Sequence, residues 1–220
     1  MTRNNLEKRI SLLTSELAEV GTLVEKQIYD SIIALKSNEL ELANEIIKND
    51  DKVDLINRRV EEKCLKLMAT ESPLATDLRK IFATSKIVTD LERMADYAVD
   101  ICKITKRVSN LNIDLDREYE AIKNMFEVLK VMIKKSIDAF INGDAEEALE
   151  ICKLDDEVDN IYRSLFTEVL KDMAKDEDMI NKGTQILFVS KYLERVGDHV
   201  TNICEWIIFS TKGDYVDLNE

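Results

Sequence analysis

The chain reads Leu-Glu-Arg-Met-Ala-Asp-Tyr-Ala-Val-Asp-Ile-Cys at residues 91–102, and Leu-Glu-Arg-Val-Gly-Asp-His-Val-Thr-Asn-Ile-Cys at residues 193–204. The second stretch begins 102 residues after the first. An Asp-rich segment precedes each of them, at residues 50–54 and again 105 residues later at 155–159. The difference of three residues falls in the connection that carries Pro73, where loops tolerate a change in length. The chain is therefore predicted to be an internal duplication.

The hydrophobic pattern predicts that both repeats are helical throughout. Apolar residues recur at spacings of three and four, as in Ile10, Leu13, Leu17 and Val20, which is typical of amphipathic helices. The 220 residues include only one Pro and five Gly. Turn-forming residues interrupt the pattern at five places, which are residues 36–38, 70–73, 109–114, 142–144 and 175–182.

Five breaks predict six helices of about 28–35 residues each. The predicted fold class is all-α, with six long antiparallel helices in two pseudo-symmetric three-helix bundles. The first bundle is expected over residues 1–109 and the second over residues 110–220. At the breaks, Ser72 and Pro73 are predicted as the N-cap and first residue of a helix, and Asp144 with Glu147 as a capping box.

The charge balance excludes several classes of partner. There are 31 Lys and Arg against 44 Asp and Glu, a formal charge of −13. Such a chain is repelled by nucleic acid and by anionic lipid surfaces. The charged N-terminus leads into no signal-peptide core, and no apolar stretch approaches the roughly 18 residues of a membrane span. We expect a cytoplasmic protein with no direct membrane insertion and no nucleic-acid partner.

Acidic residues form a repeated stripe beside the apolar face of the helices. At about 100° per residue, Glu92, Asp96 and Asp100 share one side of a helix. The corresponding positions of the second repeat are Glu194, Asp198 and Asn202. The upstream helices contribute further pairs four residues apart, and these are Asp50 with Asp54 and Asp155 with Asp159.

Two interpretations of these stripes remain open from the residues alone. One is a solvated helix face, which explains most isolated acid pairs in an acidic protein. The other is a cation site, because like charges one turn apart disfavour a helix by a few tenths of a kcal/mol unless they are neutralised. Two facing helices would offer about four to six oxygen ligands, which suit Fe, Mn or Mg, or carboxylate-bound Zn.

The remaining chemistry-bearing residues do not form a catalytic set. The four Cys residues are widely spaced and are interpreted as core packing. The single histidine, His199, excludes the HExxH zinc motif and the paired ExxH motif of di-iron bundles; we interpret it as an exposed or edge residue. Three classes stay open: a regulatory adaptor, a carboxylate-metal enzyme or iron-handling bundle, and a structural module.

The LERMAD and LERVGDHVTNI segments, with the Asp-rich segments about 40 residues upstream, resemble the PhoU family over essentially the whole chain. The resemblance implies two three-helix bundles whose E(D)xxxD motifs bind multinuclear metal clusters. The implied metal ligands are Asp50, Asp54, Glu92, Asp96 and Asp100 in one repeat and Asp155, Asp159, Glu194, Asp198 and Asn202 in the other. Lys191 and Tyr192 stand where the first repeat has Thr89 and Asp90, so the two sites differ chemically.

The same resemblance implies a function, which is regulation and not catalysis. Members of the family act in the cytoplasm with the ATPase subunit of the phosphate-specific ABC transporter and with a phosphate-sensing histidine kinase. They repress the phosphate-starvation response when phosphate is plentiful. The resemblance also implies a homodimer, and Fe, Zn, Mn or Mg as the bound metal.

Overall fold

The computed structural model describes residues 3–109 and 116–218 of the chain. These residues form six α-helices of 27 to 35 residues and confirm the predicted all-α fold. The helices are α1 (Arg3–Ser37), α2 (Leu40–Glu71), α3 (Ala75–Val108), α4 (Asp116–Asn142), α5 (Ala145–Met173) and α6 (Met179–Lys212). The predicted break at 109–114 falls mostly outside the described residues.

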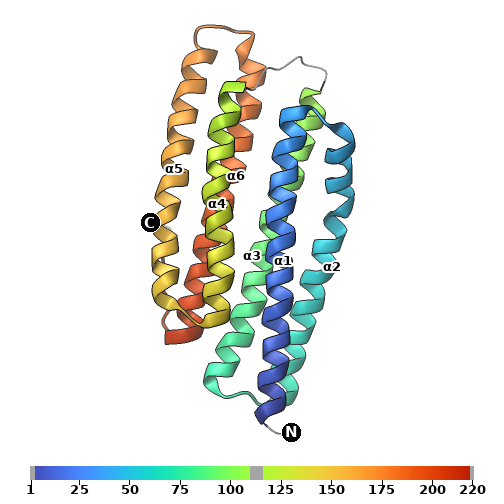
Figure 1. Ribbon diagram of the computed structural model, residues 1–220, viewed down its shortest axis with the longest axis vertical. Helices are drawn as coiled ribbons and strands as arrows, with labels where there is room; N and C mark the ends of the chain where they lie inside the picture. The colour runs from blue at the N-terminus through green and yellow to red at the C-terminus, as the bar shows by residue number, and fades with distance from the viewer. Residues whose placement is uncertain (1–2, 110–115, 219–220) are drawn as a thin grey trace.

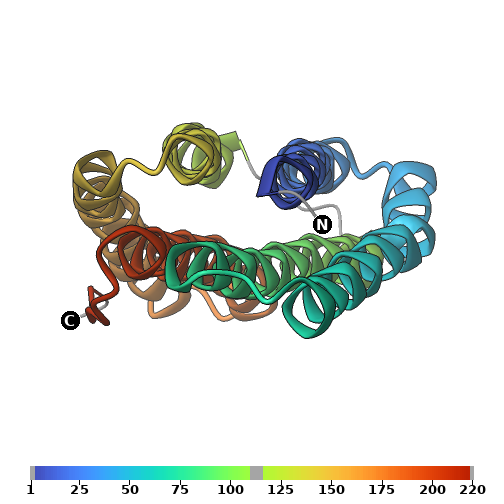
Figure 2. The same cartoon turned by 90° about the horizontal axis from the view of Figure 1, so that it is seen from below.

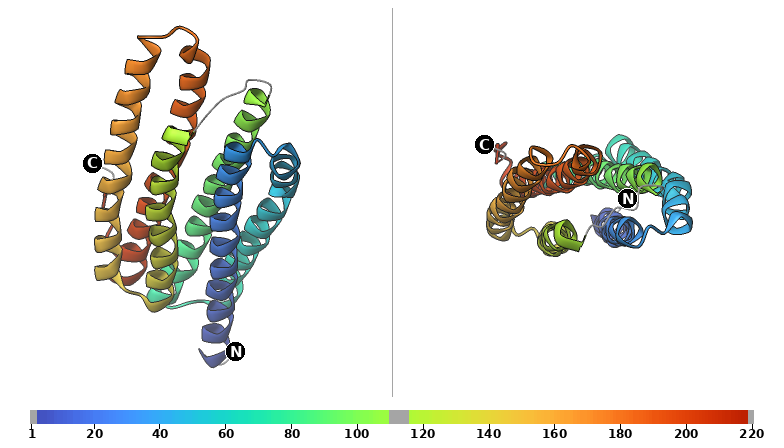
Figure 3. Two further views of the ribbon diagram at one scale, coloured as in Figure 1. Left: turned by 45° about the horizontal axis from the view of Figure 1, so that its top comes forward. Right: turned by 90° about the horizontal axis from the view of Figure 1, so that it is seen from above.

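The helices form two layers, and the two repeats lie side by side (Figure 1). Figure 2 shows α5, α6, α3 and α2 as one curved layer, in that order, with α1 and α4 over its concave side. The repeats meet where α3 packs against α6 and where α1 packs against α4. The view from above in Figure 3 shows the same order. The duplicated stretches 91–102 and 193–204 belong to α3 and α6, the two central helices of this layer.

The duplicated stretches supply equivalent parts of the core. Leu91 and Leu193 are fully buried, as are the other apolar residues on the same face of each helix. Cys102 and Cys204 are also fully buried, which confirms their interpretation as packing residues. Because the apolar face of each helix is buried, the acid stripe beside it is held at the margin between core and solvent.

The helix ends correct one prediction and support another. Ser72 and Pro73 do not start a helix: Ser72 ends α2 in the left-handed region at φ 46°, and α3 begins only at Ala75. Asp144 does cap α5, since its carboxylate accepts the backbone N–H groups of Glu146 and Glu147 at 3.1 and 2.9 Å. The side chain of Glu147 pairs with Lys135 at 2.8 Å.

Over residues 3–109 and 116–218, none of the helices combines the length and the apolar character that crossing a bilayer requires.

Candidate functional site

The first cluster consists of Asp50 and Asp54 on α2 together with Glu92 and Asp96 on α3. Burial raises the pKa of Asp50, and the charges of Asp96 and Asp54 raise it further. Burial also raises the pKa of Glu92, with Asp96, Asp54 and Asp50 adding to the effect. Because these carboxylates perturb one another across two helices, the structure brings the four predicted residues together.

Basic side chains form ion pairs with the carboxylates of α3 in this cluster. Arg93 contacts the carboxylates of Asp96 at 2.9 Å and Glu92 at 3.4 Å. Asp100, the fifth predicted ligand, lies at the end of the stripe and pairs with Lys103 at 2.8 Å. Arg93 is 56% exposed in its pair with Asp96, and an exposed pair of this kind contributes under about 1 kcal/mol.

The second cluster consists of Asp155 and Asp159 on α5 together with Glu194 and Asp198 on α6. Burial raises the pKa of Asp155 to about 7, and the charges of Asp159, Asp198 and Glu194 contribute to the rise. Burial raises the pKa values of Glu194 and Asp198 as well. The second repeat thus reproduces the arrangement of the first. Its inner aspartate, Asp155, lies in an environment that opposes ionisation of the carboxyl group.

Gly197 makes room for that inner aspartate. A Cβ atom at this position would lie 2.2 Å from Oδ1 of Asp155, which is too close for any real contact. The first repeat has Ala95 at the equivalent position, and it is fully buried. Oδ1 of Asp155 is buried and has no hydrogen-bond partner, whereas the buried Oε2 of Glu194 lies 2.5 Å from Nζ of Lys191. Buried carboxylate oxygens without partners are costly, so this donor set fits a cation.

The carboxylates are not already arranged around a single point. Within residues 3–109 and 116–218, no group of three or more His, Cys, Asp and Glu side chains stands ready to hold a metal ion. The outer members turn toward basic residues instead, as Asp159 does toward Arg163 at 2.5 Å. Exposed pairs of this kind are weak, so rotation of a few side chains would bring the carboxylate oxygens of a cluster together around one point.

Asn202, the fifth predicted ligand of the second repeat, is placed differently. Its amide donates to Oδ1 of Asp90 on α3 at 3.4 Å, across the boundary between the repeats. His199 shares this acceptor, with Nδ1 2.9 Å from the same oxygen. The histidine is therefore a half-buried residue between the repeats, and the prediction of an exposed or edge position is only partly right.

The residues that sequence reasoning missed lie around these clusters. Asp90 was visible only as a mismatch with Tyr192 between the repeats. Tyr97 stacks on Tyr192 with ring centroids 5.7 Å apart, and its hydroxyl oxygen lies 3.5 Å from the guanidinium of Arg195. Such contacts join α3 to α6, so no pattern within one helix could have revealed them.

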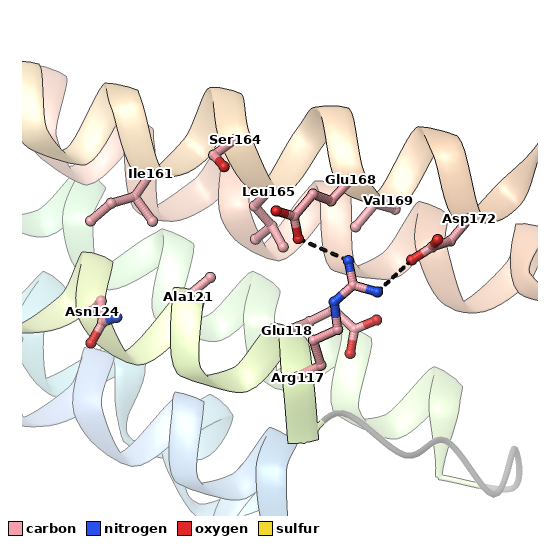
Figure 4. A pocket seen from close by; sticks show the side chains of 10 residues that line it. All are labelled: Arg117, Glu118, Ala121, Asn124, Ile161, Ser164, Leu165, Glu168, Val169 and Asp172. Atoms are coloured by element: carbon pink, nitrogen blue, oxygen red, sulfur yellow. Dashed lines mark hydrogen bonds and ion pairs between the residues drawn. The ribbon is translucent and has the colours of Figure 1, made fainter.

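A cavity of about 240 Å³ lies away from both clusters, between α4 and α5 (Figure 4). Arg117 bridges Glu168 and Asp172 at one end of it, with both contacts at 2.9 Å. None of the residues that line this cavity belongs to either cluster.

The fold and the clusters together define a duplicated helical protein with one group of facing carboxylates in each repeat. Comparison with known proteins identifies the family to which such a protein belongs. The family model described as "PhoU domain" matches twice, at residues 17–105 and 122–207. The chain therefore belongs to the PhoU family, as its motifs suggested.

Individual relatives match over nearly their whole length. The chain is 44% identical to a phosphate-specific transport system accessory protein PhoU homolog from Clostridium acetobutylicum, over all of both chains. It is 36% identical to the homolog from Borreliella burgdorferi, over 99% of this chain and all of the relative. The crystal structure of PhoU from Pseudomonas aeruginosa matches with a TM-score of 0.88 and 31% identity, covering 94% of this chain and 99% of that one.

These relatives bear on the choice between enzyme and regulator. A second structure, from Streptococcus pneumoniae, matches with a TM-score of 0.88 and 28% identity and is described as a phosphate transport system regulatory protein. It covers 96% of this chain and 99% of its own. The predicted absence of enzymatic activity is confirmed by this membership, and the enzyme alternative is set aside.

Proposed function

We propose that the protein couples phosphate uptake to gene expression in the cytoplasm. It contacts the ATPase subunit of the phosphate-specific ABC transporter and a phosphate-sensing histidine kinase, and it represses the starvation response when phosphate is plentiful. The observation that carries this proposal is the match to accessory and regulatory proteins of phosphate transport over the full chain. The acidic charge of −13 is consistent with protein partners in place of nucleic acid.

Metal binding is the second part of the proposal. The two clusters would hold hard or borderline cations such as Fe, Zn, Mn or Mg through facing carboxylates. Asp100 and Asn202, at the stripe ends, would join them by exchanging their present partners, Lys103 and Asp90. A bound cation would neutralise like charges and tie α2 to α3 or α5 to α6. The buried Oδ1 of Asp155, which lacks a hydrogen-bond partner, supports this use.

Neutralisation would also change the surface that a partner meets. The eight clustered carboxylates lie on four helices of one layer, and both clusters flank the boundary between α3 and α6. With cations bound, this layer would present much less negative charge. Metal loading is thus a means of setting which partner the protein binds, since charge complementarity controls association.

Expression of phosphate-starvation genes tests the regulatory part. Deleting the gene in its host should leave a starvation-promoter reporter active even in high phosphate, and the wild-type gene should restore repression. A reporter that stays repressed in the deletion strain would contradict the proposal. Complementation with an Asp96→Asn, Asp198→Asn variant then asks whether the clusters are needed, with Asp51→Asn, Asp156→Asn as the matched control at exposed neighbours.

We further propose that the protein forms a homodimer. Long amphipathic helices leave apolar residues at their margins, as Leu55 and Leu65 do on α2 with 63% of their surface exposed. Light scattering after size exclusion would give about twice the chain mass of 25.3 kDa. A mass that stays at that of one chain across a wide concentration range would refute the dimer.

A further inference from the structure

Lys191 is a cation built into the second cluster. Its Nζ lies 2.5 Å from the carboxylate of Glu194, one of the inner members of the cluster. Its charge also lowers the pKa of Asp198 against the effect of burial. An ammonium group therefore already neutralises part of the charge that a metal ion would neutralise.

The first cluster has a neutral residue at the equivalent position. Thr89 precedes Glu92 by three residues, as Lys191 precedes Glu194. The hydroxyl of Thr89 donates to the main-chain oxygen of Ser85 at 3.0 Å and lies 3.4 Å from Glu61. The lysine that acts on the first cluster is Lys103, and its partner is Asp100 at the end of the stripe. Glu92 has no lysine partner among the contacts of the described residues.

The neighbouring helices differ in the same direction. On α2 the acidic stripe continues through Asn57 and Glu61, whereas on α5 the corresponding residues are Tyr162 and Phe166. These two rings pack against each other with centroids 5.9 Å apart. Nζ of Lys191 lies 5.5 Å from the centre of the Tyr162 ring, a distance at which a cation is attracted to the aromatic face.

Lys191 thus has two favourable partners within reach. Paired with Glu194, it occupies the place of a metal, and turned toward Tyr162, it leaves the carboxylates free. The aromatic ring lowers the cost of the second arrangement, because the ammonium group keeps a partner there. A metal that enters the second cluster must displace Lys191, which is 39% exposed and lies 2.5 Å from Glu194. A metal that enters the first cluster must displace Arg93, which is 56% exposed and lies 3.4 Å from Glu92.

We propose that Lys191 is the affinity-determining residue of the second cluster, so that the two clusters bind metal in order, the first cluster before the second. This inference rests on the proposed metal-binding function and adds the order of loading. The protein would then respond to divalent cation over a wider range of concentration than two identical sites allow. The first repeat would be loaded at low concentration and the second only at higher concentration.

The test measures Mn²⁺ binding to each cluster by itself, by equilibrium dialysis with detection of free Mn²⁺ by electron paramagnetic resonance. Asp50→Asn with Glu92→Gln silences the first cluster, and Asp155→Asn with Glu194→Gln silences the second. The intact first cluster should bind Mn²⁺ about tenfold more tightly than the intact second cluster, as expected for one charge at close range.

Exchange of the equivalent residues assigns the difference to Lys191. With the first cluster silenced, Lys191→Thr should tighten Mn²⁺ binding at the second cluster about tenfold. With the second cluster silenced, Thr89→Lys should weaken binding at the first by a similar factor. Lys135→Thr removes the same charge from an ion pair between α4 and α5 and should change neither affinity.

Thermal unfolding, measured without and then with metal, gives a second readout. In chelator, Lys191→Thr should lower the melting temperature, because Glu194 loses its counter-ion, and added Mn²⁺ should restore it. Equal affinities at the two clusters, or no effect of Lys191→Thr, would overturn this inference and leave the metal proposal standing. Absence of Mn²⁺ binding to the wild-type protein would overturn both.

Discussion

The two acidic clusters each consist of four carboxylates at equivalent positions of the repeats, and the residues around them differ. In the first, the acids extend along α2 toward Glu61, and the contacting basic residues are exposed. In the second, Gly197 admits Asp155 deep between the helices, aromatic rings replace the extra acids, and Lys191 pairs with Glu194. The comparison teaches that duplication preserved the four carboxylates while the residues around them diverged, so equivalent acids lie in two different electrostatic environments.

The shared core should give the largest effect and should be equal in both halves. Leu91 and Leu193 are fully buried at equivalent positions. Truncating either one to alanine should lower the free energy of unfolding by about 3 kcal/mol, since a buried leucine leaves a cavity. Urea denaturation measures this, with Leu65→Ala on the exposed face of α2 as the control. Markedly unequal losses would show that the two cores are not equivalent.

Stability of the metal-free protein should fall as pH rises, and mostly because of the second cluster. The pKa of Asp155 is about 7 in the folded state, above the ordinary value of about 3.9 that applies when unfolded. Between these values the folded protein holds a proton that the unfolded chain releases, so stability declines over this window and levels off above it.

Replacing that carboxylate should remove the decline. In chelator, Asp155→Asn should make the free energy of unfolding less dependent on pH between about 4 and 7, by about 2 kcal/mol after allowance for solvent access. Asp50→Asn in the first cluster should act in the same direction with a smaller effect, because its pKa is also raised. If denaturation curves of Asp155→Asn kept the wild-type pH dependence, the buried position of this carboxylate would be wrong.

The small residues under the clusters should respond in a matched way. Gly197→Ala places a methyl group against Asp155 and should lower the free energy of unfolding by about 1.5 kcal/mol. Ala95→Gly, at the equivalent place, should cost about 1 kcal/mol through helix propensity and a further amount through the loss of a buried methyl group. Metal-free proteins in urea provide the measurement, and a stabilised Gly197→Ala would contradict the close approach of Asp155.

The exposed ion pairs should give the smallest effect. Arg93 is 56% exposed and Arg163 is 68% exposed in their pairs with Asp96 and Asp159. Replacing either arginine with alanine should change the free energy of unfolding by about 0.5 kcal/mol or less, and high salt should erase the difference. A loss above about 1.5 kcal/mol in either variant would mean that these pairs are structural, and the carboxylates could not turn freely toward a metal.

Most of the fold could be predicted from the sequence, because helical periodicity and duplication are local or repeated signals. Stripe geometry predicted that Asp50 and Asp54 share one side of a helix and that Glu92 and Asp96 share one side of another, and the family resemblance implied that the two pairs form one cluster. The predicted start of α3 was wrong. Ser72 and Pro73 match the sequence pattern of a helix N-terminus, but they follow the end of α2.

The contacts between the repeats could not be predicted. Asp90 with His199 and Asn202 forms only when α3 packs against α6, and no spacing within one helix specifies that neighbour. The ion pair between Lys191 and Glu194 was similarly hidden, because the sequence shows a lysine near acids but not which acid it contacts. The metal itself, the dimer and the partners remain predictions that follow from family membership and chemistry.

The central claim is that the clustered carboxylates, and not the acidic surface in general, bind metal. The most direct measurement is the amount of Mn²⁺ bound per chain at equilibrium in three proteins. These are the wild type and two variants that each lose two carboxylates, Asp96→Asn with Asp198→Asn and Asp51→Asn with Asp156→Asn. The account predicts that the first pair of substitutions abolishes most of the uptake and that the second pair, at exposed neighbours, leaves it unchanged. Equal uptake by all three proteins would contradict it.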